Sequence, residues 1–194
     1  MIVREPIVAW RQWNFMYPHF LANLGNDTIY VPREKIEAHC EQYSTIGTLV
    51  HRKDHSEQAP HLTCMCGIYA YKEKPRLLRE IRNIYSGLWL VANNRYVPIY
   101  GEINLWGKVI EHEDGYRAQF GYPTRLWCTP AIEPLAGWIG YVYGVPCEVM
   151  PSGDDEEIKI NSPRSIIPKY ACGQTYYHVG FCPKCFVLNI KAKR

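Results

Sequence analysis

Apolar and polar residues alternate along much of this chain, and a period of two predicts β-strands. The alternating stretches are rich in β-branched and aromatic residues, which favour strands because they pack well on a pleated surface. We predict strands over residues 7–15, 28–31, 67–72, 88–92, 95–112, 116–128 and 145–150. Asp114-Gly115 lies between the two longest stretches and predicts a two-residue hairpin turn, across which His112 faces Arg117.

A helical pattern follows Pro32, a residue that is tolerated at the first position of a helix. Behind it, residues 33–43 place Ile36, Cys40 and Tyr43 at intervals that share one helix face. This spacing predicts a helix over 33–43 that carries Cys40.

Two further segments predict helices. Residues 75–86 have the clearest apolar stripe in the chain, and Gly87 supplies a natural C-terminal stop. Residues 131–144 follow Thr129-Pro130, a pair suited to an N-cap and a first helical position, although internal Pro and Gly residues weaken this helix.

Short strands mixed with two or three helices predict an α+β fold on an antiparallel, partly barrel-like sheet. At 194 residues the chain is long enough for one sizeable core. Residues 151–157 combine turn formers with four acids and mark a composition break. We therefore predict a β-rich domain over 1–150 and a basic, Cys-rich C-terminal segment over 151–194, which is too short to hold a core without help.

Charge and composition narrow the functional classes. A net charge of +3 with scattered Lys and Arg does not by itself indicate a polyanion binder. The first 15 residues carry Arg4, Glu5 and Arg11 where a signal peptide needs an apolar core, and no stretch reaches the roughly 18 apolar residues of a membrane span. We expect a cytoplasmic protein without membrane association, whose eight cysteines serve as thiols or metal ligands rather than disulfides.

The C-terminal segment carries the stronger metal motif. Cys182-Pro-Lys-Cys185 can direct two sulfurs at one tetrahedral ion, and Cys172 and His178 would complete four ligands. Bound zinc would also supply folding energy that this segment lacks. The same pair is compatible with a redox dithiol or with plain reduced thiols, so structural zinc is one of three interpretations.

A second candidate metal site is the pair Cys64-Met-Cys66, with Cys40 and His61 as further ligands. Two thiolates one residue apart can bind one ion if the residue between them turns outward. In an extended strand they would instead share one face of the sheet, where free cysteines pack as small apolar groups. A metal site, core packing and a disulfide or redox pair all stay open.

Nucleic-acid binding is also compatible with the C-terminal segment. Tyr176 and Tyr177 could stack on bases while Lys169 and Lys184 contact phosphates. The same aromatic residues would serve equally well for packing against the main domain.

Several uncommon sequence motifs follow one another in a characteristic order between residues 7 and 147. They are AHC (38–40), CMCGIYAYK (64–72), INLWGKVIEHEDGYRAQFGYP (103–123) and YGVP (143–146). In these motifs the chain resembles a family of bacterial and phage proteins for which no activity is established. The resemblance implies that Cys40, Cys64 and Cys66 belong to one constellation, and it implies no mechanism.

No Gly-rich phosphate loop, His-Glu-X-X-His helix or Gly-X-Ser-X-Gly elbow is present in the sequence. Our first hypothesis is a non-enzymatic cytoplasmic binding or adaptor protein with structural zinc that engages a host or phage protein. The alternatives are an enzyme or small-molecule binder with a cleft near the Cys-X-Cys pair and the 103–123 hairpin, and a nucleic-acid binder that uses the C-terminal segment.

Overall fold

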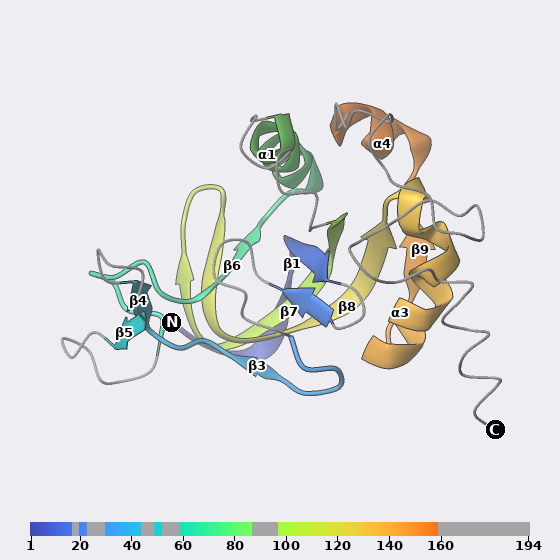
Figure 1. The fold of residues 1–194 in the computed structure, drawn as a ribbon. Coiled ribbons are helices and arrows are strands. Elements are labelled where there is room, and N and C mark those ends of the chain that lie inside the picture. The colour runs from blue at the N-terminus through green and yellow to red at the C-terminus, as the bar shows by residue number, and fades with distance from the viewer. Residues whose placement is uncertain (17–19, 23–29, 44–48, 52–58, 87–96, 159–194) are drawn as a thin grey trace, which may run out of the picture.

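The structure is a computed structural model that describes residues 1–16, 20–22, 30–43, 49–51, 59–86 and 97–158. Three long antiparallel strands form its centre: β1 (Ile2–Met16), β7 (Val97–Glu111) and β8 (Gly115–Cys128) (Figure 1). β7 lies between the other two and pairs with both. The predicted strands at 7–15 and 116–128 are thus confirmed, and the strand at 95–112 is confirmed over 97–111, whereas the predicted strand at 88–92 lies outside the described residues. The described residues form a mixed α+β fold rich in strands.

Shorter strands extend this sheet at its edges. They are β2 (Phe20–Ala22), β3 (Ile36–Glu37), β6 (Ile68–Tyr71) and β9 (Cys147–Val149), while β4 (Glu41–Tyr43) pairs with β5 (Leu49–His51) in a separate small sheet. β6 pairs with β8 along its length but meets β1 only at Trp10 and Tyr71. Because a single residue pair joins that side, the sheet is not a clear barrel, and the barrel-like part of the prediction is not supported.

Both faces of the sheet are covered. Ile99 and Tyr100 are neighbours on β7, so their side chains point to opposite faces, and both are fully buried. Ile99 belongs to the larger apolar cluster, which includes residues of the 3-10 helix η2 (Pro130–Leu135) and of α3 (Ala136–Tyr143). Tyr100 belongs to a second cluster, built with α1 (Lys74–Ser86) and α4 (Ser152–Ile158), which lie next to each other in Figure 1.

The helices follow the expected patterns in part. The predicted helix at 75–86 is confirmed as α1, whose Leu77, Leu78 and Ile81 are buried against the sheet. The predicted helix at 131–144 divides into η2 and α3, because Pro134 lacks a backbone donor and the backbone turns before it. α4 occupies most of the expected composition break. None of the helices in the described part of the chain is long and apolar enough to cross a membrane.

The predicted helix over 33–43 is wrong. Arg33 has a left-handed backbone (φ 63°), and its N–H donates to the hydroxyl of Tyr122 at 2.6 Å. Ile36 then pairs with Gly121 in the sheet, and the following residues continue into β4. The backbone groups that would close helical turns bond to β8 instead, so tertiary pairing overrides a weak local pattern.

The predicted hairpin turn is displaced by one residue. The N–H of His112 donates to the carbonyl of Gly115 at 2.8 Å, which leaves Glu113 and Asp114 as the two loop residues. Gly115 is needed elsewhere: a Cβ at this position would overlap the carbonyl oxygen of Ala70 on β6. The glycine therefore allows two strands to approach closely, and it does not supply the positive φ of a turn.

Candidate functional site

Three cysteine sulfurs come together at one end of the structure. The Sγ atoms of Cys40, Cys64 and Cys66 all lie within 4.8 Å of one another, and those of Cys40 and Cys64 are 3.6 Å apart. A tetrahedral zinc site with bonds of about 2.3 Å has sulfurs roughly 3.8 Å apart. These three thiols could therefore bind a metal ion after small shifts.

The local structure explains how two of these thiols meet the third. Cys64 and Cys66 lie in a turn that precedes β6, and the N–H of Cys64 donates to the carbonyl of His61 at 3.2 Å. Gly67 ends this loop with φ 128°, where an added Cβ would come within 3.1 Å of the Arg117 side chain. A larger residue at this position would push the loop away from the sheet. We name residues 61–66 the cysteine loop.

No disulfide joins the three cysteines in the structure. Burial, together with the neighbouring Cys64 thiol, raises the pKa of Cys40 to about 12. Burial also raises the pKa of Cys66, although the backbone of His61 opposes this effect. Without a metal, Cys40 and Cys66 are therefore protonated at neutral pH, and a metal would have to displace those protons.

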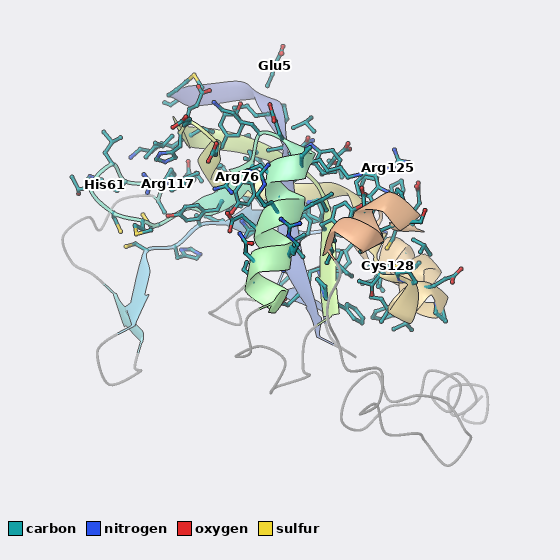
Figure 2. The ribbon with its side chains drawn as sticks, turned by 90° about the horizontal axis from the view of Figure 1, so that it is seen from above. Glu5, His61, Arg76, Arg117, Arg125 and Cys128 are labelled. Carbon is teal, nitrogen blue, oxygen red and sulfur yellow. The ribbon has the colours of Figure 1, made fainter. Side chains whose placement is uncertain are left out.

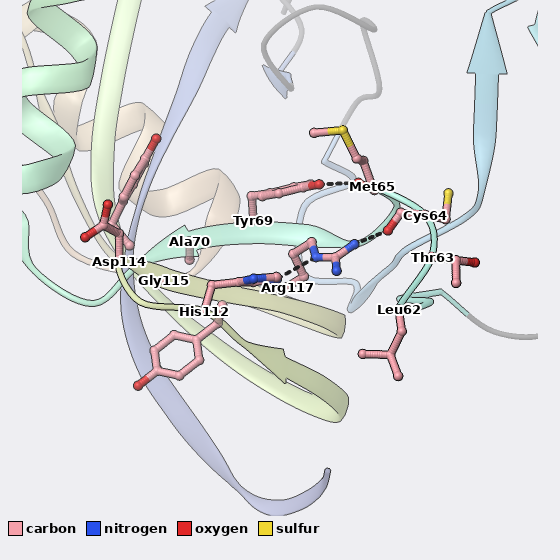
Figure 3. Close-up of a pocket in the computed structure, with 12 residues that line it drawn as sticks. Leu62, Thr63, Cys64, Met65, Tyr69, Ala70, His112, Asp114, Gly115 and Arg117 are labelled. Atoms are coloured by element: carbon pink, nitrogen blue, oxygen red, sulfur yellow. Dashed lines mark hydrogen bonds between the residues drawn. The ribbon is translucent and has the colours of Figure 1, made fainter.

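Arg117 on β8 links the sheet to the cysteine loop through the backbone carbonyls of the loop. Its guanidinium donates to the carbonyl of Cys64, and it lies 3.4 Å from the carbonyls of His61 and Cys66 (Figure 3). Its Nε donates to Nε2 of His112 at 2.8 Å. Because a guanidinium only donates, Nε2 of His112 is the acceptor, and the neutral ring carries its proton on Nδ1.

Among the described residues, no acid forms an ion pair with Arg117. The residue is only 5% exposed, and the salt bridges found among the described residues do not include it. Its described partners are three carbonyls, the imidazole of His112 and the ring face of Tyr69, whose centroid lies 5.9 Å from the guanidinium carbon, and none of these groups carries a negative charge. Buried charges are normally paired, so this end of the sheet favours an anion near the cysteine loop.

A pocket of about 430 Å³ opens beside this cluster, between the cysteine loop and the β7–β8 hairpin (Figure 3). It is lined by Leu62, Thr63, Cys64, Met65, Tyr69, Ala70, Tyr71, His112, Asp114, Gly115, Tyr116 and Arg117. The hydroxyl of Tyr69 donates to the carbonyl of Met65 and so ties the pocket wall to the loop. At the rim, Leu62 is 78% and Met65 is 82% exposed.

The structure groups some of the predicted ligands and leaves others undecided. It brings Cys40, Cys64 and Cys66 together, and within the described residues no fourth His, Cys, Asp or Glu ligand atom joins this group. Nδ1 of His61 lies 3.0 Å from the hydroxyl of Thr63, and the ring is not part of the thiol group. The role of His61 as a metal ligand therefore stays a prediction. The other predicted site residues lie outside the described residues: Cys172, His178, Cys182, Cys185, Lys169, Tyr176, Tyr177 and Lys184.

Sequence reasoning missed the residues that shape the pocket. The sequence indicates for Arg117 only a position opposite His112 in the hairpin, and no local pattern distinguishes it from Arg125 on the same strand. Leu62 lies just before the two cysteines and Met65 lies between them, in a loop whose sequence has no periodicity that would indicate their exposure. Their exposure depends on tertiary structure, which no local pattern encodes.

A scan against protein-family models, a search of curated proteins and a search of solved structures each find no match to this chain. The resemblance to bacterial and phage proteins thus stays a prediction.

Proposed function

We propose that this chain is a non-enzymatic binding protein that accepts an apolar side chain of a protein partner in the pocket beside the cysteine loop. The observation that carries the proposal is the pocket itself, an apolar hollow with exposed Leu62 and Met65 at its rim. Its volume falls within the roughly 300–1,000 Å³ that is typical of binding sites.

The walls of the pocket suit an aromatic or branched aliphatic group. Tyr69, Tyr71 and Tyr116 contribute aromatic surface, and Ala70 and Gly115 leave space between them. An aromatic side chain buries roughly 150–250 Å². At about 25 cal/mol/Å² this corresponds to roughly 4–6 kcal/mol before the cost of association is subtracted.

The rim favours a macromolecular partner over an enclosed small molecule. Leu62 and Met65 project beyond the pocket, and exposed apolar patches on a protein surface commonly mark interaction sites. Methionine is flexible and polarisable, so it adapts to differently shaped partners. A peptide could fill the pocket with one side chain and cover the rim with its neighbours.

One polar group is available to orient such a peptide. His112 accepts from Arg117 through Nε2, so its Nδ1–H can donate to an incoming carbonyl oxygen. The preferred ligand is therefore an extended peptide with an apolar anchor residue and a backbone carbonyl beside it.

Selection of a random peptide library on the immobilised full-length protein tests this proposal. Enriched peptides should share an apolar anchor, and they should lose affinity for the Leu62→Glu/Met65→Glu double variant. Val8→Glu is the matched control, since Val8 is an apolar residue on β1 that is 60% exposed and does not line the pocket. Peptides that bind the double variant as well as the wild type would refute the proposal.

A small-molecule or enzymatic role for the same pocket is the second candidate. Its support is the combination of an apolar pocket with the polar side chains of His112 and Arg117. This candidate predicts that His112→Ala abolishes turnover or binding of a small substrate while the melting temperature is unchanged. A small molecule that binds the His112→Ala variant and the wild type equally would count against it.

A further inference from the structure

We infer that Cys40, Cys64 and Cys66 bind one zinc ion, and that this ion fastens the wall of the neighbouring pocket. The zinc site stands independently of the proposed function. Its effect on the pocket wall would matter for binding only if that proposal holds.

The donor set selects a soft or borderline cation. Three thiolates at these separations suit zinc, whereas hard cations such as magnesium and calcium prefer oxygen ligands. Zinc commonly takes a fourth donor, and His61 on the same loop is the predicted one. The cluster joins two segments that are 24 residues apart in sequence, which is typical of a structural cross-link.

The electrostatics of the site support a bound metal thiolate. When a zinc ion replaces the protons of three thiols, three protons leave and the centre carries a net charge of −1. Arg117 is buried directly beneath the loop, where it contacts the carbonyls of Cys64 and Cys66. The guanidinium compensates that charge, and the metal centre gives Arg117 a counter-ion, which no acid in the described part of the chain supplies.

A disulfide between Cys40 and Cys64 is the competing outcome. It would release two electrons and two protons to an oxidant such as molecular oxygen or oxidised glutathione, and it would leave Cys66 as a lone thiol. The product is neutral, so Arg117 would still lack a negative partner among the residues that the structure describes. The structure therefore favours the metal centre.

The zinc site and the pocket share the cysteine loop. Cys64 lines the pocket and belongs to the thiol cluster, while Cys40 belongs to the cluster alone. Changing Cys40 therefore alters the metal site without removing a pocket residue. A metal bound at this site restrains the cysteine loop, and with it Leu62 and Met65, which belong to that loop.

Zinc counting on the full chain tests the site. Because the C-terminal cysteines are predicted to bind zinc as well, the informative quantity is the difference between variants and wild type, each purified in reductant and reloaded with zinc. Cys40→Ala and Cys66→Ala should each lose one zinc per chain. Cys128→Ala, which removes a cysteine at the other end of the sheet (Figure 2), should lose none. Full zinc content in both Cys40→Ala and Cys66→Ala would overturn the inference.

Hydrogen exchange tests the link to the pocket wall. In the wild type, zinc should slow exchange of the amides in residues 59–71 relative to chelated protein, and in Cys40→Ala zinc should have no such effect. Exchange in α1 should be unchanged, which shows that the variant is folded. Equal exchange at 59–71 with and without zinc would overturn the proposed restraint. If zinc binds as expected but no apolar peptide does, only the proposed function fails.

Discussion

Nε of Arg117 lies 2.8 Å from Nε2 of His112, although these two residues do not face each other across the β7–β8 hairpin. Ile110 is the residue opposite Arg117. His112 lies two residues nearer the turn, on the same face of the strand, and reaches the guanidinium diagonally. This contact joins the hairpin to the cysteine loop, because the same guanidinium bonds to the carbonyl of Cys64.

Replacement of Arg117 should weaken the metal site and the fold together. Arg117→Gln removes the positive charge and leaves carbonyls of the loop without their donor, so we expect zinc affinity to fall at least about tenfold and the free energy of unfolding to fall by roughly 1–3 kcal/mol. Arg117→Lys keeps the charge but loses the forked set of donors, so its zinc affinity and its free energy of unfolding should lie between those of the wild type and of Arg117→Gln. Competition with a chromophoric chelator and thermal melting provide the measurements.

Arg125→Gln is the matched control for this comparison. Arg125 lies on the same strand, is exposed, and pairs with Glu148 far from the cysteine loop (Figure 2). Its replacement should change stability by less than about 1 kcal/mol and leave zinc affinity unchanged. An Arg117→Gln variant with the zinc affinity of Arg125→Gln would show that the guanidinium does not compensate the metal centre.

The pH dependence of stability should differ between zinc-loaded and chelated protein. The pKa of Cys40 is raised to about 12, so the folded chelated protein holds this proton more tightly than an unfolded chain, whose thiol titrates near 8.5. That contribution is fully present below about pH 8.5 and is lost as pH rises towards the folded pKa. Chelated wild type should therefore lose stability as the pH rises above about 8.5.

Zinc reverses this dependence, because protons compete with the metal for the thiols. Zinc affinity should rise with pH over the same range, and chelated Cys40→Ala should lose less stability than the chelated wild type. Melting curves at several pH values provide the measurement. A zinc affinity that does not change with pH would mean that the metal displaces no thiol protons.

The long strands and α1 could be predicted because local pattern and tertiary environment agree there. In α1, the spacing of Leu77, Leu78 and Ile81 fits a helix that buries one face, and that face is buried. The segment around Ile36 and Cys40 was mispredicted because two short strands can carry the same spacing as a helix. Pairing with β8, which lies about 80 residues later in the chain, decided between them.

The candidate site was predictable only in its chemistry. The spacing of Cys64 and Cys66 indicates a possible ligand pair with Cys40 as a candidate further ligand, and the resemblance implies that these three cysteines belong to one group. The distance between these thiols, however, depends on Gly67 and Arg117, whose roles appear only when β6 and β8 are paired. One of the alternative hypotheses already places a cleft near the Cys-X-Cys pair and the 103–123 hairpin, but the residues that line the pocket depend on how this loop and this hairpin, about 50 residues apart, pack together.

Two glycines provide a test of the strand packing beside the pocket. Gly115→Ala would place a Cβ against the carbonyl of Ala70, so we expect a loss of roughly 2 kcal/mol or more in the free energy of unfolding. Gly137→Ala is the control, because nothing lies within 4 Å of a Cβ there and alanine favours the helix by up to about 1 kcal/mol. Denaturant unfolding measures both, and a stable Gly115→Ala variant would contradict the described pairing of β6 with β8.

The end of the main domain can be located by truncation. Ile158 is only 1% exposed in the cluster under α1, and Asp154 receives a hydrogen bond from Tyr100 and an ion pair from Lys74. A chain that ends at residue 150 should be less stable than one that ends at 158 by roughly 2–4 kcal/mol. Equal melting temperatures of the two chains would place the boundary at 150 and make α4 dispensable.

The coupling between metal and pocket is measured most directly by titrating a selected apolar peptide into zinc-loaded and chelated protein. Because both ligands act on the cysteine loop, zinc should tighten peptide binding, within the roughly 5- to 150-fold range typical of linked sites. The peptide must then tighten zinc binding by the same factor, and Cys40→Ala should abolish the difference. Equal peptide affinity with and without zinc in the wild type would contradict a metal-fastened binding pocket.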